Sequence, residues 1–252
     1  MVRAIMHGCN GQMGQMITSI VKDMDEIEIV AGVDISDHIK NDYPVFKSLA
    51  ECDVDADVVI DFASAKATDA LLDYCEAKAV PVVLCTTGLS DEQVKRATEE
   101  SIKKTAVLKS ANMSLGINLL MKLLKEAADV LAPAGFDIEI VEKHHNRKLD
   151  APSGTALALA DSINEARDNE YEYVYDRSTR REKRRPKEIG ISAVRGGNIV
   201  GDHDVIFAGC DEVITFSHSA YSRAVFAKGA VQAAIFLADK KTGLYDMSDV
   251  IG

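Results

Sequence analysis

Residues 2–14 read VRAIMHGCNGQMG, a short apolar run followed at once by the spaced glycines Gly8, Gly11 and Gly14. The run Val2–His7 is typical of a buried strand, and apolar residues recur at helical spacing from Met13 onward. Glycines between a strand and a helix allow a tight turn, close approach of the backbone to a pyrophosphate, and close helix packing. The stretch therefore predicts the strand–turn–helix that begins a dinucleotide-binding fold.

An acidic residue strengthens this prediction. A second predicted strand, Ile27–Val33, ends on Asp34, about 20 residues after the glycines, where a carboxylate can accept hydrogen bonds from a ribose 2′-hydroxyl. Asp34 would repel a 2′-phosphate, and neither Ile35 nor Gln12 supplies a compensating cation. We therefore expect NADH and/or NADPH as the cofactor, with NADH used at least as well. The glycine spacing differs from the common G-x-G-x-x-G, so an ordinary strand–turn–helix is the alternative.

Two later loops extend the predicted cofactor site. Each follows a predicted strand, and ligands of open parallel sheets bind beyond the carboxyl ends of the strands. An ordinary polar turn is the alternative for each. The predicted cofactor-binding residues are Gly8, Cys9, Asn10, Gly11, Gln12, Met13, Asp34, Cys85, Thr86, Thr87, Ser110, Ala111, Asn112 and Met113.

The order of predicted elements indicates two domains. Strands and helices alternate up to residue 112, which predicts parallel βαβ units with helices on both faces of a sheet. A long helix over Leu115–Leu131 then follows, and later strands between residues 189 and 217 are joined by short glycine-bearing turns that favour antiparallel pairing. We predict an α/β chain with a Rossmann-like parallel sheet domain and a smaller α+β domain with a mixed, largely antiparallel sheet.

A cationic segment lies directly before a predicted helix. Residues 142–156 read EKHHNRKLDAPSGTA. Imidazoles and a lysine can exchange protons near neutral pH, and a helix start can bind an anion through its backbone N–H groups. The segment predicts a site that binds a carboxylate and protonates a group beside it; a basic surface stretch is the alternative. Adjacent strand residues point to opposite faces, so His144 and His145 are poorly placed to share a metal, and we predict none.

Composition excludes several classes of partner. A net charge of −11 argues against nucleic acid and anionic membranes, and no apolar run approaches the roughly 20 residues of a membrane span. The 5 cysteines are scattered, which favours reduced thiols and a cytoplasmic location. A second basic stretch, residues 177–187, is interpreted as a solvated loop, with a lid or an electrostatic funnel as the alternative.

Over nearly its whole length the chain resembles the dihydrodipicolinate reductase family. The resemblance implies reduction of 4-hydroxy-tetrahydrodipicolinate, a small cyclic dicarboxylate, by NAD(P)H in lysine and diaminopimelate biosynthesis. The chain departs from the family at Gln12, where a basic residue is frequent, and at Cys85, where glycine is frequent. The residues that carry the resemblance are Gly8, Gly11, Met13, Gly14, residues 86–88, Ala111, Asn112, Glu142, His144, His145, Lys148, residues 150–156, Arg195, Gly197, Gly201, His203, His218 and Arg223.

The resemblance also implies a role for each matched residue of the cationic segment. His144 would be the catalytic acid/base and Lys148 a catalytic proton donor, while His145, Gly154 and Thr155 would hold a substrate carboxylate. Residues 1–112 and 219–252 would form the dinucleotide-binding domain, and residues 113–218 the substrate-binding and tetramerisation domain of a homotetramer. Two alternatives stay open: a non-catalytic NAD-binding sensor, or another two-domain amino- or keto-acid dehydrogenase.

Overall fold

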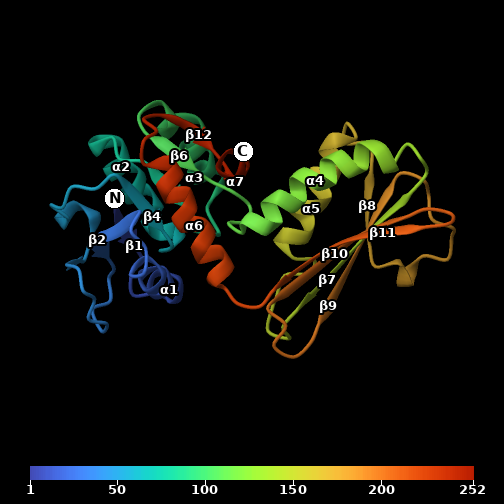
Figure 1. Cartoon of the computed structure of the whole chain (residues 1–252), viewed down its shortest axis with the longest axis horizontal. Helices are drawn as coiled ribbons and strands as arrows, with labels where there is room; N and C mark the ends of the chain where they lie inside the picture. The colour runs from blue at the N-terminus through green and yellow to red at the C-terminus, as the bar shows by residue number, and fades with distance from the viewer. The chain divides into compact units, whose positions relative to one another are not determined.

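The computed structural model describes all 252 residues and divides into two compact units (Figure 1). The first unit contains Met1–Leu115 and Ala224–Gly252, and the second contains Gly116–Arg223. The borders observed in the structure therefore lie a few residues beyond the predicted positions near 112 and 218.

The first unit is built on one parallel sheet of 7 strands. The Rossmann-like sheet predicted from the alternation of strands and helices is confirmed. In spatial order the strands are β12 (Gly243–Tyr245), β6 (Ala106–Leu108), β5 (Val82–Leu84), β4 (Val58–Asp61), β1 (Val2–His7), β2 (Ile27–Val33) and β3 (Val45–Phe46).

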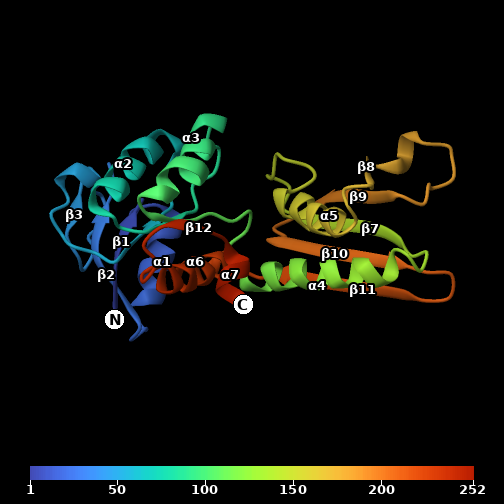
Figure 2. The ribbon, with the colours of Figure 1, turned by 90° about the horizontal axis from the view of Figure 1, so that it is seen from above.

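Helices cover both faces of this sheet, which explains why its strands are apolar almost throughout. Ala4 and Met6 of β1 face one helical layer, whereas Ile5 between them faces the other. Figure 2 shows α1, α6 and α7 on one side of the sheet and α2 and α3 on the other. The helices are α1 (Gln12–Val21), α2 (Thr68–Lys78), α3 (Asp91–Lys95), α6 (Ala224–Leu237) and α7 (Met247–Ile251).

Some of the shortest elements do not follow from the sequence pattern. Ser90 and Gln93, spaced as in a capping box, indicate the start of a helix, and α3 begins with this capping box. It then continues as a π-helical turn, η3 (Arg96–Glu100), and a 3₁₀ turn, η4 (Ser101–Lys103). The edge strands β3 and β12 were not predicted, because each has only two or three residues and lies outside the run of alternating strands and helices that indicated the other strands.

The second unit has a mixed sheet of 5 strands in the order β11-β10-β7-β9-β8. Its mixed character is confirmed, but it is less antiparallel than expected. β10 pairs antiparallel with both β11 and β7, whereas β9 pairs parallel with β7 and β8. The strands are β7 (Asp137–His144), β8 (Glu172–Tyr175), β9 (Glu188–Arg195), β10 (Gly201–Ala208) and β11 (Val213–Ala220).

The unexpected parallel pairs have a simple geometric cause. β9 and β10 follow one another in sequence, yet both lie beside β7 instead of forming a hairpin. Neighbouring strands are about 4.8 Å apart, so the short connection between them easily passes one strand. The sequence indicates the turn between β9 and β10, but it does not indicate that β7 lies between these two strands.

One face of the second sheet carries the core of this unit. β7 alternates between half-buried and fully buried residues, and its buried Ile138 and Ile140 pack against α4 (Leu115–Leu131) and α5 (Gly154–Ala166). The two helices lie side by side (Figure 1), and Ser162 Oγ of α5 donates a hydrogen bond to the Met121 carbonyl of α4. The same alternation places Glu142 and His144 on the buried face of β7. None of the helices in either unit is long and apolar enough to cross a membrane.

Candidate active site

His144 is the last residue of β7 and lies on its buried face, where the Glu142 carboxylate forms a hydrogen bond with its ring. Its Nδ1 donates to Glu142 Oε2 at 2.6 Å, because an ionised carboxylate can only accept. Glu142 is 0% exposed and receives both terminal nitrogens of Arg195 at 2.7 Å. Burial opposes ionisation of Glu142, but hydrogen bonds from Arg195, His144 and the Ser153 backbone outweigh it and lower its pKa. The site therefore holds a stable anion under the imidazole.

The start of α5 is tied to the same carboxylate. The Ser153 backbone N–H donates to Glu142 Oε1 at 2.9 Å, and Ser153 Oγ caps the helix by accepting from the Ala156 N–H. Gly154 and Thr155 form the first turn, where Gly154 is exposed and nothing occupies the space beside its Cα. The predicted carboxylate-binding turn is thus positioned relative to His144 by one buried side chain.

His203 on β10 completes the interior of this site. Its Nε2 lies 3.0 Å from Ser153 Oγ, and its ring meets the His144 ring edge-on at 5.2 Å between centroids. Burial, and then the nearby His144, lower the pKa of His203 to about 4, so His203 is neutral near pH 7. The family resemblance includes His203 but implies no role for it. The register of β10 against β7 places His203 opposite Glu142, and its ring reaches Ser153.

The cations of the segment divide between two faces of the sheet. Lys143 points away from His144 and pairs with Asp204 at 2.8 Å, so it does not belong to the predicted anion site. Lys148 Nζ lies 2.8 Å from Asp150, and its backbone N–H donates to the His145 carbonyl. Partial burial, followed by the charges of Arg147, His144, Arg223 and Lys148, lowers the pKa of His145. His145 and Lys148 therefore lie in one cationic neighbourhood with His144.

The second basic stretch is largely neutralised by acidic partners. Arg184 contacts Asp137 at 2.7 Å and Glu139 at 3.0 Å, and Lys187 pairs with Glu170. Such pairing removes the positive field that an electrostatic funnel would need. The funnel alternative for residues 177–187 thus loses its main support.

In the first unit, the glycine loop has the shape that a bound pyrophosphate requires. Gly8 has a φ of +82°, and a Cβ there would lie 2.6 Å from the Phe62 carbonyl oxygen. A Cβ at Gly14 would lie 2.3 Å from the Gly8 carbonyl oxygen. The loop leads directly into α1, which begins at Gln12. Only glycine fits these two positions, so the turn and the close helix packing predicted from the sequence fit a dinucleotide.

Asp34 is fixed by the backbone around it. Its Oδ2 accepts from the Asn10 N–H and its Oδ1 from the Ser36 N–H, both at 2.9 Å. A carboxylate has about four lone-pair sites, so Asp34 keeps capacity for a ribose hydroxyl. Asn10 is itself buried and donates to the Ser36 carbonyl, while burial raises the pKa of the Cys9 thiol to about 11. The Asn10 side chain therefore ties the loop to Ser36, and Cys9 is a buried, neutral thiol beside it.

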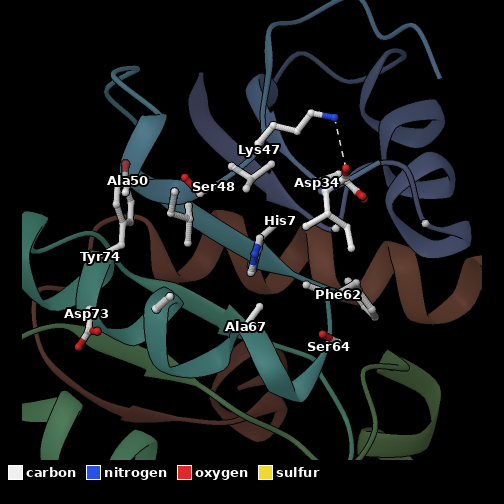
Figure 3. A pocket seen from close by; sticks show the side chains of 17 residues that line it. His7, Asp34, Lys47, Ser48, Ala50, Phe62, Ser64, Ala67, Asp73 and Tyr74 are labelled. Carbon is white, nitrogen blue, oxygen red and sulfur yellow. Dashed lines mark hydrogen bonds between the residues drawn. The ribbon is translucent and has the colours of Figure 1, made fainter. Parts of the chain in front are cut away.

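A pocket of about 650 Å³ lies beside this loop (Figure 3). Of the predicted cofactor residues it gathers Gly8, Gly11 and Asp34. Its walls do not include the remaining predicted loop residues. Of these, Gln12 is exposed at the start of α1, Met13 is half-buried, and Cys85, Thr86, Thr87, Ser110, Ala111, Asn112 and Met113 follow β5 and β6.

Two features of this pocket were missed by the sequence analysis. His7, at the end of β1, borders the pocket, and its Nδ1 lies 2.7 Å from the buried Asp61 at the end of β4. Lys47, just after β3, also lines the pocket. Both sit at carboxyl ends of parallel strands, which is the signal that could have found them.

A parallel sheet with this glycine loop and an acidic residue ending its second strand defines a dinucleotide-binding protein, here with a second α+β unit. The family model "Dihydrodipicolinate reductase, N-terminus" matches residues 2–113, and "Dihydrodipicolinate reductase, C-terminus" matches residues 116–251. The chain belongs to the dihydrodipicolinate reductase family.

Individual relatives agree with this assignment. The chain is 55% identical to the 4-hydroxy-tetrahydrodipicolinate reductase of Caldanaerobacter subterraneus subsp. tengcongensis, covering 100% of this chain and 98% of the relative. It is 51% identical to that of Clostridium tetani, covering 98% and 96%. Its fold matches the structure of dipicolinate-bound dihydrodipicolinate reductase from Paenisporosarcina sp. TG-14 with a TM-score of 0.79, 28% identity, and coverage of 98% and 97%.

Proposed function

We propose that this chain is an NAD(P)H-dependent oxidoreductase that reduces 4-hydroxy-tetrahydrodipicolinate to tetrahydrodipicolinate in lysine and diaminopimelate biosynthesis. Full-length relatives of the same name support the activity. The observation that carries the proposal is the position of His144. It is held by the buried Glu142–Arg195 ion pair and lies close to the Ser153-capped start of α5.

The substrate and product names differ by one hydroxyl, so the reaction adds a hydride and a proton and releases water. Bound NAD(P)H supplies the hydride. Since Glu142 engages Nδ1 of His144, Nε2 is the nitrogen that exchanges a proton. Gly201 keeps that nitrogen accessible, because a Cβ there would lie 3.0 Å from His144 Nε2. His144 thus acts as the acid/base residue, with the tautomer set by the carboxylate beneath it.

Lys148 and the helix start divide the remaining tasks. The Lys148 ammonium is a second proton donor, released from its exposed partner Asp150 when an anionic substrate arrives. His145, Gly154 and Thr155 hold a substrate carboxylate, which suits a helix N-terminus with a cationic neighbourhood. On this proposal the second unit is the substrate-binding domain, and the family resemblance adds the role of tetramerisation domain.

The first unit is the dinucleotide-binding domain. Gly8, Gly11 and the start of α1 would hold the pyrophosphate, and Asp34 a ribose hydroxyl of the adenosine half. The predicted loops at 85–87 and 110–113 would line the rest of the cofactor. A fixed carboxylate at Asp34 supports the proposal that NADH is used at least as well as NADPH.

We further propose a cytoplasmic homotetramer, on the strength of the family resemblance. Light scattering on the purified chain would give a mass four times the 27.3 kDa protomer. A monomer or dimer at working concentration would contradict the tetramer and leave the assignment of the reaction untouched.

The decisive experiment follows oxidation of NADH with freshly generated 4-hydroxy-tetrahydrodipicolinate. The reductase predicts substrate-dependent turnover and formation of tetrahydrodipicolinate. Folded protein that binds NADH but shows no turnover would instead support the NAD-binding sensor. Turnover only with other amino or keto acids would support a different dehydrogenase.

A further inference from the structure

The immediate sequence neighbours of Asp34 carry no cation, but the fold brings one from a distant segment. β2 and β3 pair in parallel with Val33 beside Phe46, and the Asp34 N–H donates to the Phe46 carbonyl at 3.0 Å. The next residue of each strand is therefore Asp34 on one side and Lys47 on the other. Both line the same pocket, and Figure 3 shows Lys47 reaching toward the strand end that carries Asp34.

Lys47 is held only by groups that can release it. Its Nζ donates to the Ile35 carbonyl at 3.2 Å and to Asp37 Oδ2 at 2.8 Å. The Lys47 and Asp37 side chains are 51% and 83% exposed, and exposed ion pairs contribute little free energy. The Lys47 ammonium can therefore exchange Asp37 for another anion that enters the pocket.

Asp34, by contrast, has little freedom to move. Its two oxygens are bound to backbone N–H groups on either side, from Asn10 and Ser36. A 2′-phosphate near the ribose would meet this fixed negative charge, so the repulsion has to be offset by a cation in the pocket wall. Lys47 is the cation that the strand register places there.

We propose that Lys47 is the residue that lets this site accept a 2′-phosphorylated dinucleotide, by leaving Asp37 to pair with the phosphate beside Asp34. The inference rests on the proposed dinucleotide-binding function of the first unit. On this basis Asp34 favours NADH, Lys47 permits NADPH, and Asp37 competes with the phosphate for the ammonium.

Dissociation constants of NADH and NADPH for the full chain, titrated without substrate, test the proposal independently of reductase activity. Lys47→Met keeps the aliphatic stem and should weaken NADPH about 5- to 20-fold, as expected for losing a partly exposed charge-assisted hydrogen bond, with NADH changed less than about twofold. Lys47→Arg should preserve NADPH binding. Asp37→Asn should tighten NADPH while leaving NADH unchanged.

Lys22→Met is the matched control, because Lys22 also pairs with an exposed aspartate, Asp42, but lies outside this pocket. It should change neither constant. Equal weakening of both cofactors by Lys47→Met would show that Lys47 only holds the 35–37 loop, and no effect on NADPH would equally overturn the proposal. Absence of NADH binding in the unmodified chain would instead contradict the proposed function.

Discussion

Replacing Glu142 by glutamine tests whether the buried carboxylate controls proton exchange at His144. Glu142 accepts hydrogen bonds from His144 Nδ1 at 2.6 Å, from the two terminal nitrogens of Arg195 at 2.7 Å, and from the Ser153 N–H at 2.9 Å. Glutamine has nearly the same shape but only one acceptor oxygen. Its NH₂ group must therefore face two donors, Arg195 and the His144 ring in one orientation, or Arg195 and the Ser153 N–H in the other.

The expected loss follows from this mismatch. If the amide NH₂ faces Nδ1, the His144 proton moves to Nε2, and the ring can no longer take a proton there. A catalytic histidine whose carboxylate partner becomes an amide loses about 10⁴ in turnover through the wrong tautomer. Because the amide oxygen can still satisfy part of the Arg195 and Ser153 bonding, we expect kcat to fall about 10²–10⁴-fold. The free energy of unfolding should fall by about 1–3 kcal/mol, since the Arg195 guanidinium loses its anionic partner.

The assay compares kcat, the NADH dissociation constant and the pH profile of kcat/KM for both proteins. NADH binding should be unchanged, whereas the pH profile should shift, which a purely structural defect would not produce. Glu139→Gln is the matched control, because Glu139 lies on the same strand and also pairs with an arginine, Arg184, yet does not touch His144. Wild-type kcat in folded Glu142→Gln, or an equal loss in Glu139→Gln, would refute the positioning role.

Other residues of the site give separable outcomes. His144→Gln should lower kcat about 10²–10⁴-fold with an unchanged NADH dissociation constant, and an unaltered rate would remove His144 from the chemistry. Lys148→Ala should also lower kcat; a rise in KM alone would make Lys148 a binding residue. His203 contributes a pH dependence, because its pKa of about 4 lies below the 6.5 of the unfolded chain. The unfolded chain thus binds the proton first as the pH falls, so folding stability is lost from about pH 6.5 toward pH 4, by about 3 kcal/mol at about 1.4 kcal/mol per unit. Denaturant unfolding across this range should show a shallower decline in His203→Gln; identical slopes would contradict the buried neutral state.

The long, strongly patterned elements could be predicted from the sequence. β1 and α4 were found with their observed bounds, because a buried strand beside glycines and a long helical stripe are each unambiguous. β3 could not be found, since two residues carry no periodicity. With β3 missing, Lys47 had no predicted neighbour, and the site around Asp34 looked free of cations.

In the candidate catalytic segment, too, the sequence could not show which distant residues become neighbours. Its residue types suggested an anion site, but they could not show that Lys143 turns to the opposite face or that Arg195 pairs with Glu142. Arg195 is brought there by the parallel register of β9 with β7, which sets it beside His144 along the sheet. The sequence suggested a hairpin between β9 and β10. In such a hairpin β9 would not lie next to β7 on that side, so Arg195 would not be expected beside His144.

Both sites therefore depend on a residue delivered by strand register from outside the recognised motif. In the second unit, Arg195 of β9 neutralises Glu142, so that a buried carboxylate can stay ionised and hold the His144 tautomer. In the first, β3 brings Lys47 to the wall of the pocket that Asp34 also lines, where we propose that it offsets the Asp34 charge toward a 2′-phosphate. The motifs supply the acidic groups, and the register supplies the cations that determine what those groups do. Substitutions that change the cation while keeping the motif, such as Lys47→Met, should consequently alter cofactor choice without abolishing the fold.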